Sequence, residues 1–144
     1  MSAIRRTLRF WCSGVVLLVT CALVGCGAYL RLGTTFLQEF PSPDGNWDAI
    51  LMVRNGGAMT GYATVVSVNG DYWLARQFAL VWPTAVFAVD DNDGKVSWGD
   101  RGQINVKAHW VTGTQLVVTY PKQARVLRQE PGVHSVNVQY LVSE

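Results

Sequence analysis

The chain has 144 residues, of which 49% are hydrophobic and only 15% are charged. Average soluble domains carry about 25% charged residues, so part of the apolar excess must be buried or concentrated in one segment. The length allows one domain of ordinary size and excludes a two-domain enzyme. From residue 27 onward, nine Lys/Arg stand against ten Asp/Glu. A basic nucleic-acid-binding protein is therefore not supported, and no nucleic acid partner is expected.

The N-terminal segment has the pattern of a secretory signal. Residues 10–30 contain no charged side chain and follow Arg5, Arg6 and Arg9, as an apolar core follows a basic region. Within this run, Leu23-Val24-Gly25-Cys26 resembles the lipobox of bacterial lipoproteins. The resemblance implies that residues 1–25 are a signal peptide and that Cys26 becomes the first residue and carries lipid. Several acyl chains would anchor the protein stably in a membrane.

An uncleaved membrane-spanning helix, reaching to about residue 30, is the alternative for the same segment. Residues 10–30 also satisfy the ~20 residues needed to cross a bilayer. In both models the N-terminal arginines favour a cytoplasmic N-terminus, so the rest of the chain is expected on the periplasmic or extracellular side of a bacterial envelope. Residues 26–40 would then form the lipid anchor and tether. Gly27 after Cys26 resembles the sorting signal for the outer membrane.

The three cysteines, Cys12, Cys21 and Cys26, all lie in this targeting region. The exported domain, expected at residues 41–144, therefore contains no internal disulfide. Zinc sites with cysteine ligands and cysteine nucleophiles are excluded from it for the same reason. Its stability must come from a hydrophobic core.

The exported domain has the sequence pattern of an all-β fold. It begins at a turn-rich boundary, where Pro41 and Pro43 precede Asp44-Gly45. Residues 49–53 are apolar on both faces, which is typical of a central strand. Asn69-Gly70 is a strong hairpin signal. It predicts that residues 64–68 pair with residues 72–74, and further strands are predicted at residues 84–89, 104–110, 115–120, 124–128 and 133–142.

The second half of the domain gives the clearest strand patterns. Residues 104–110 alternate between apolar and polar side chains, so one face of this strand is predicted to be buried. Residues 124–128 and 133–142 are predicted to pair across Pro131-Gly132, with Val142 among the buried side chains. About seven strands at this spacing predict a small antiparallel β-sandwich or open barrel. Most of the tryptophans are expected in its core.

The turn Ser42-Pro43-Asp44-Gly45 is similar to the start of β-propeller blades of the TolB type. A propeller needs at least four such blades, and the single copy here excludes that fold. Together with residues 53–68 and 120–126, the turn resembles a group of uncharacterised small bacterial envelope lipoproteins. The resemblance implies an envelope location and names no activity. Met59 and Asn55-Gly56 depart from the threonine and Cys-Gly that are usual in that group.

A glycine bend beside an arginine is the first candidate binding site. Arg54 precedes Asn55-Gly56-Gly57, whose glycines permit positive φ, and Thr60 and Tyr62 add hydroxyl groups nearby. Backbone N–H groups beside an arginine can hold an anion, and a plain glycine-rich hairpin loop explains the same residues. The pattern is neither a P-loop nor a dinucleotide fingerprint.

Two tryptophans next to turn signals form the second candidate. Trp82 and Trp98 are followed by proline and glycine, so they are the best candidates for an exposed binding surface. Residues 90–94 are acidic but lack the EF-hand register, so a solvated turn is expected rather than a metal site. His109 and His134 are the only histidines, and no role as zinc ligands or general bases is expected of them. No metal or cofactor is expected.

Two functional hypotheses remain. The first is a non-catalytic module, such as an immunity or exclusion-type inhibitor, that binds a protein partner through exposed Trp and Tyr side chains. It would also contact the membrane through its N-terminal lipid or helix. The second is a small periplasmic hydrolase or ligand carrier that uses Arg54, the glycine bend and His109 or His134.

Overall fold

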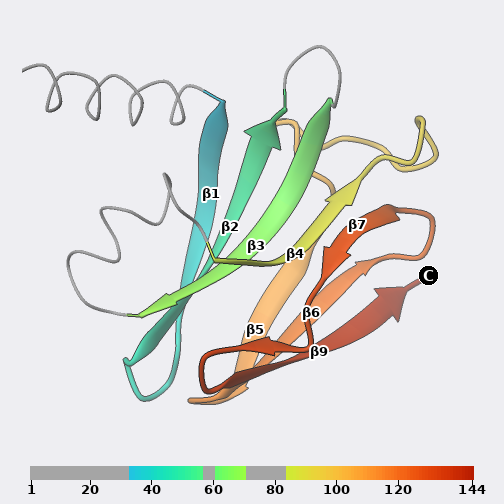
Figure 1. Ribbon diagram of the computed structural model, residues 1–144. Helices are drawn as coiled ribbons and strands as arrows, with labels where there is room; N and C mark the ends of the chain where they lie inside the picture. The colour runs from blue at the N-terminus through green and yellow to red at the C-terminus, as the bar shows by residue number, and fades with distance from the viewer. Residues whose placement is uncertain (1–32, 57–60, 71–83) are drawn as a thin grey trace, which may run out of the picture. The chain divides into compact units, whose positions relative to one another are not determined.

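The computed structural model describes residues 33–56, 61–70 and 84–144, and within them the protein is all-β without a helix (Figure 1). Residues 33–144 form one compact unit. The apolar run at residues 10–30 and Cys26 lie outside the described residues. The strands are β1 (Thr34–Pro41), β2 (Trp47–Asn55), β3 (Tyr62–Gly70), β4 (Ala85–Asp90), β5 (Lys107–Thr112), β6 (Gln115–Pro121), β7 (Arg125–Gln129), β8 (Gly132–Val133) and β9 (Val136–Ser143).

Two sheets pack face to face as a β-sandwich, as the sequence predicts. The first sheet has five strands in the order β1-β2-β3-β4-β7, and all its neighbours are antiparallel. The second sheet has four strands in the order β5-β6-β9-β8. Within it β6 and β9 run parallel, so the sandwich is mixed rather than purely antiparallel. Parallel neighbours need a long crossover, and here the chain passes through β7 in the other sheet between β6 and β9.

The main core lies between the two sheets and draws on both. Phe87 of β4 is fully buried, and its ring lies 4.9 Å from the ring of Tyr120 and 5.1 Å from that of Tyr140, measured between centroids. The central strand β2 is buried on both faces, which confirms the interpretation of its two-sided apolar pattern. Ile50 and Met52 belong to a second, smaller cluster on the face of the sheet that points away from the main core.

The folded unit begins at Gly33, earlier than the boundary expected near Pro41. Residues assigned from sequence to the tether form β1, an edge strand paired with β2. A register shift between Phe36 and Gln38 turns Leu37 into the main core. The turn-rich stretch after Pro41 is therefore a connection between two paired strands and not the start of the domain.

The predicted pairing of residues 124–128 with residues 133–142 is wrong. β7 pairs with β4 in the first sheet, whereas β9 pairs with β6 and with the two-residue strand β8. Apolar alternation shows which face of a strand is buried and does not show its neighbour. Val142 is also exposed (54%) rather than buried, because it lies near the end of β9 beyond the covered part of the core.

The strand predicted at residues 104–110 is correct in its faces and shifted in its position. Ala108 is buried and His109 is exposed on β5, as the alternation predicts. Ile104 is buried just before the strand, where its backbone N–H donates to Thr64 Oγ1 at 2.7 Å. The predicted partner of residues 64–68, residues 72–74, lies outside the described residues.

The turn between β1 and β2 is held by its own side chains. Ser42 Oγ donates to Asp44 Oδ1 at 2.6 Å, and Asn46 Nδ2 donates to Asp44 Oδ2 at 2.8 Å. The hydrogen bond from Ser42, followed by those from Asn46, holds the pKa of Asp44 below its ordinary value. The Asp44 carboxylate lies so close to Gly113 in the β5–β6 turn that a Cβ there would clash with it. A side chain at position 113 would have to displace the Asp44 carboxylate from its hydrogen bonds with Ser42 and Asn46, which favours glycine there.

Tyr140 connects the two sheets through its hydroxyl group. The hydroxyl oxygen lies 2.9 Å from the carbonyl oxygen of Val86 and 2.6 Å from that of Glu130. The two carbonyl oxygens share the hydroxyl group as their hydrogen-bond donor. Burial, as the largest cause, raises the pKa of Tyr140 to about 12. The neutral hydroxyl therefore stabilises the fold at pH values below the ordinary tyrosine pKa of about 10, and this stabilisation is lost as the pH rises toward 12.

Tyr140→Phe is expected to lower the free energy of unfolding by about 1–3 kcal/mol, because partly buried carbonyl groups lose their donor. Chemical denaturation of the full chain in mild detergent, followed by tryptophan fluorescence, measures the change. Tyr62→Phe is the matched control, because Tyr62 is 50% exposed and losing a hydroxyl group at an exposed position should cost less than about 0.5 kcal/mol. Equal losses in the two variants would contradict a bridging role for Tyr140.

Candidate functional site

The glycine bend lies at the end of the first sheet where β2 ends and β3 begins. Arg54 and Asn55 are the last residues of β2, and Asn55 pairs with Tyr62 at the start of β3. The Gly56 N–H donates to the carbonyl oxygen of Gly61 at 2.8 Å, and Gly61 has a φ of 65°. These contacts make a hairpin connection. Of the sequence candidates in the bend, Gly57 and Thr60 lie outside the described residues.

Trp98 reaches the same end from the loop between β4 and β5. Its ring meets the ring of Tyr62 edge-on, with centroids 6.1 Å apart and an interplanar angle of 70°. Trp98 Nε1 donates to Asp91 Oδ2 at 3.1 Å, which fixes the indole on the loop. Tyr62 is 50% exposed and Trp98 is 37% exposed. We call this pair the aromatic rim; Trp82, the other tryptophan candidate, lies outside the described residues.

The carboxylates of the acidic turn after β4 make hydrogen bonds and an ion pair within the domain. Asp90 accepts the backbone N–H of Asn92 at 2.9 Å and pairs with Arg125. Asp91 Oδ2 accepts the backbone N–H of Gly94 at 3.0 Å in addition to the Trp98 indole. The carboxylates therefore shape the loop that carries Trp98. Within the described residues no group of three or more potential ligands is placed to hold a metal ion.

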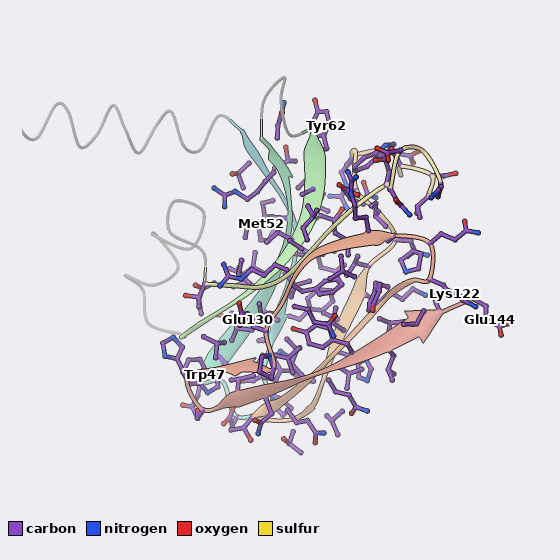
Figure 2. The ribbon with its side chains drawn as sticks, turned by 45° about the vertical axis from the view of Figure 1, so that its right-hand side comes forward. Trp47, Met52, Tyr62, Lys122, Glu130 and Glu144 are labelled. Atoms are coloured by element: carbon purple, nitrogen blue, oxygen red, sulfur yellow. The ribbon has the colours of Figure 1, made fainter. Side chains whose placement is uncertain are left out.

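The residues of the enzyme hypothesis are not brought together. His109 is exposed in the middle of β5. His134 lies in the turn before β9, where its ring stacks on Trp47 at 5.4 Å between centroids. Trp47 begins β2 and Arg54 nearly ends it, so Arg54 and His134 lie at opposite ends of the sheet. Figure 2 shows this separation through the positions of Tyr62 and Trp47.

A further surface, which the sequence reasoning missed, surrounds β7. All five residues of this edge strand are exposed, among them Val126 (37%) and Leu127 (52%). Next to the strand is a hollow of about 540 Å³ whose lining comes from β6, β7, β9 and the residues between and after them: Tyr120, Lys122, Ala124, Val126, Val142, Ser143 and Glu144. We call β7 and this hollow the edge surface. Figure 2 labels two of its lining residues, Lys122 and Glu144, which lie apart from Tyr62 in this view.

The sequence analysis misses the edge surface because it predicts the wrong neighbour for this strand. A strand paired with β9 would have been covered on that side, whereas β7 has β4 as its single neighbour within the described residues. The usable signal was the run of residues 125–129, in which apolar and charged side chains do not alternate cleanly.

No protein-family model, curated protein or solved structure matches this chain significantly. Among the residues that the structure describes, no helix is long and apolar enough to span a membrane.

Proposed function

We propose that the chain is a membrane-anchored protein of the bacterial envelope whose β domain binds a protein partner on the extracytoplasmic side without catalysing a reaction. The observation that carries the binding role is the exposed edge strand β7 beside an apolar hollow. The anchoring role is supported by the three N-terminal arginines, the uncharged residues 10–30 and the lipobox-like sequence that ends at Cys26.

The edge strand supports protein binding because of its unused backbone. A strand at the edge of a sheet has N–H and C=O groups that pair readily with an extended segment of another chain. Charged side chains often block such edges, but the two arginines of β7 are engaged within the domain. Arg125 pairs with Asp90 at 2.6 Å, and Arg128 Nε lies 3.2 Å from Glu130 Oε1.

The hollow supports the same role because of its lining. Val126 and Val142 expose apolar side chains between the two sheets, next to Ala124 and the ring of Tyr120. Side chains of an extended segment alternate between its two faces, so a segment beside β7 would direct every second side chain toward this hollow. Backbone pairing would then provide affinity, and the hollow would select an apolar side chain.

Comparative capture with matched variants tests the binding role. We expect a partner that co-purifies with the tagged full chain, extracted from native membranes in mild detergent, to fall at least tenfold with Leu127→Arg. Gln139→Arg, the control, adds the same charge at an exposed position on β9 and should retain the partner. Intact mass of the same extract decides whether the chain starts at Cys26 with lipid or retains its N-terminus.

Four outcomes would contradict binding of a distinct protein partner. The wild-type chain could capture no protein, Leu127→Arg could retain the partner, or both variants could lose it equally. Capture of nothing but a second, differently tagged copy of this chain would make β7 a self-association edge and would likewise overturn a distinct protein partner.

A further inference from the structure

The chain joins the β domain at the end that carries the aromatic rim. The carbonyl oxygen of Gly33 accepts the backbone N–H of Asn55 at 2.6 Å, and Thr34 lies opposite Arg54 in the β1–β2 register. β1 therefore starts beside the end of β2 and the start of β3, where Tyr62 lies (Figures 1 and 2). An anchor located before Gly33 would therefore keep this end of the β-sandwich nearer to the membrane than the opposite end.

The connection between the proposed anchor and the domain is short. Gly33 follows Cys26 by seven positions and follows Leu30, the last residue of the uncharged run, by three. A fully extended chain spans at most about 3.6 Å per residue, so seven residues reach about 25 Å and three reach about 11 Å. With either anchor, the end of the domain at Gly33 stays within one domain diameter of the lipid surface.

The chemistry of this end suits a lipid headgroup layer. Tyr62 and Trp98 each combine an apolar ring with a polar group, and such residues are enriched where membranes meet water. Both are substantially exposed, and their edge-on contact with the Asp91 hydrogen bond holds the rings in place without covering them. Phe36, near the start of β1, adds a third aromatic ring that is 46% exposed.

From these observations we propose that the aromatic rim docks on the phospholipid surface to which the chain is anchored, with Tyr62 and Trp98 in the headgroup layer. This inference rests on the anchoring part of the proposed function. Two aromatic side chains alone bind a bilayer weakly. A short tether raises their effective concentration at the surface to the millimolar range, so weak contacts suffice.

The charges around the rim predict how docking depends on lipid charge. Arg54 at the end of β2, Lys95 and Arg101 in the loop that carries Trp98, and Arg125 at the start of β7 are matched in number by Asp90, Asp91, Asp93 and Asp100. Because the two signs offset each other, anionic lipid should add little attraction. Docking should therefore occur on phosphatidylcholine vesicles nearly as well as on vesicles that also contain phosphatidylglycerol.

Photo-crosslinking in reconstituted vesicles tests the proposal. The full chain, purified from membranes, carries benzoylphenylalanine in place of Tyr62, of Trp98, or of Val111. Val111 is the control because it is 54% exposed and lies near the β5–β6 turn, away from the rim. After irradiation in phosphatidylcholine vesicles, with and without one quarter phosphatidylglycerol, mass spectrometry should find at least tenfold more lipid adduct at positions 62 and 98 than at position 111.

The other possible results separate a failure of rim docking from a failure of the anchoring. Equal lipid adducts at all three positions, or none at any position while the chain still floats with the vesicles, would overturn docking of the rim and leave the anchoring intact. A chain that does not float with the vesicles would overturn the anchoring and, with it, this inference. In native membranes, protein adducts at positions 62 and 98 without lipid adducts would assign the rim to a protein partner instead.

Discussion

Phe87→Ala is expected to lower the free energy of unfolding by about 3–5 kcal/mol, the usual cost of removing a buried aromatic side chain. Phe87 is fully buried in β4 and contacts the rings of Tyr120 on β6 and Tyr140 on β9. One side chain of the first sheet therefore packs on two side chains of the second. Its removal leaves a cavity where the sheets meet, and the surrounding backbone can close that cavity only in part.

Chemical denaturation of the full chain in mild detergent measures this loss. Val111→Thr is the control, because Val111 is 54% exposed and threonine keeps the β-branched shape; its effect should stay within about 0.5 kcal/mol. Phe87→Leu keeps the test informative if the alanine variant does not fold, since leucine fills part of the space and should cost less. A loss below about 1 kcal/mol for Phe87→Ala would mean that the two tyrosine rings repack and that Phe87 does not hold the sheets together.

The strands could be predicted because the local order of apolar and polar residues indicates where a strand runs and which of its faces is buried. The pattern of residues 84–89 indicates a strand, and Phe87 and Val89 are buried as expected for one. The neighbour of each strand in its sheet was harder to predict from sequence. Residues 125–129 follow β6 and precede β9, yet they join β4 through pairings such as Val89 with Val126. Such long-range choices depend on which pairing covers the most apolar surface in the whole domain, and a local window contains no such information.

The candidate site shows the same division between local and long-range information. The sequence indicates Tyr62 and Trp98 as separate candidates, the first beside a glycine bend and the second beside a turn. Their contact depends on the loop after β4, where Asp91 binds both the Gly94 N–H and the Trp98 indole. The sequence marks residues 90–94 as an acidic turn, but it does not show that this turn brings an indole to the end of β3.

Removing the negative charge of Asp90 should also lower the free energy of unfolding strongly. Asp90→Asn is expected to lower the free energy of unfolding by about 2 kcal/mol, typical of lost hydrogen bonds to a charged group. Arg125 donates from Nε at 3.0 and 2.9 Å and from Nη2 at 2.6 Å to the two Asp90 oxygens. The loss stays below that of a fully buried pair, because Arg125 is 49% exposed and water can solvate it.

The pH dependence of this loss follows from the pKa of Asp90. Burial pushes this pKa upward, but the hydrogen bonds from Arg125 and Asn92 and the charge of Arg125 outweigh burial, so the net shift is downward from 3.8. A lowered folded-state pKa means that the pair stabilises the protein above about pH 4, and that this contribution disappears as the pH falls through the folded-state pKa. The stability difference between wild type and Asp90→Asn should therefore be constant from about pH 5 to 8 and shrink below about pH 4.

Asp93→Asn is the matched control for this series. Asp93 is 81% exposed and lies 3.7 Å from Arg125, so solvent screens the pair and the substitution should cost less than about 0.5 kcal/mol. Because Asp90 and Arg125 are partners at the first position of β7, losing the pair should also loosen the edge strand. In Asp90→Asn, amide hydrogen exchange relative to wild type should accelerate more in β7 than in β3. A stability difference that persists unchanged at pH 3 would show that Asp90 acts through packing and not through its charge.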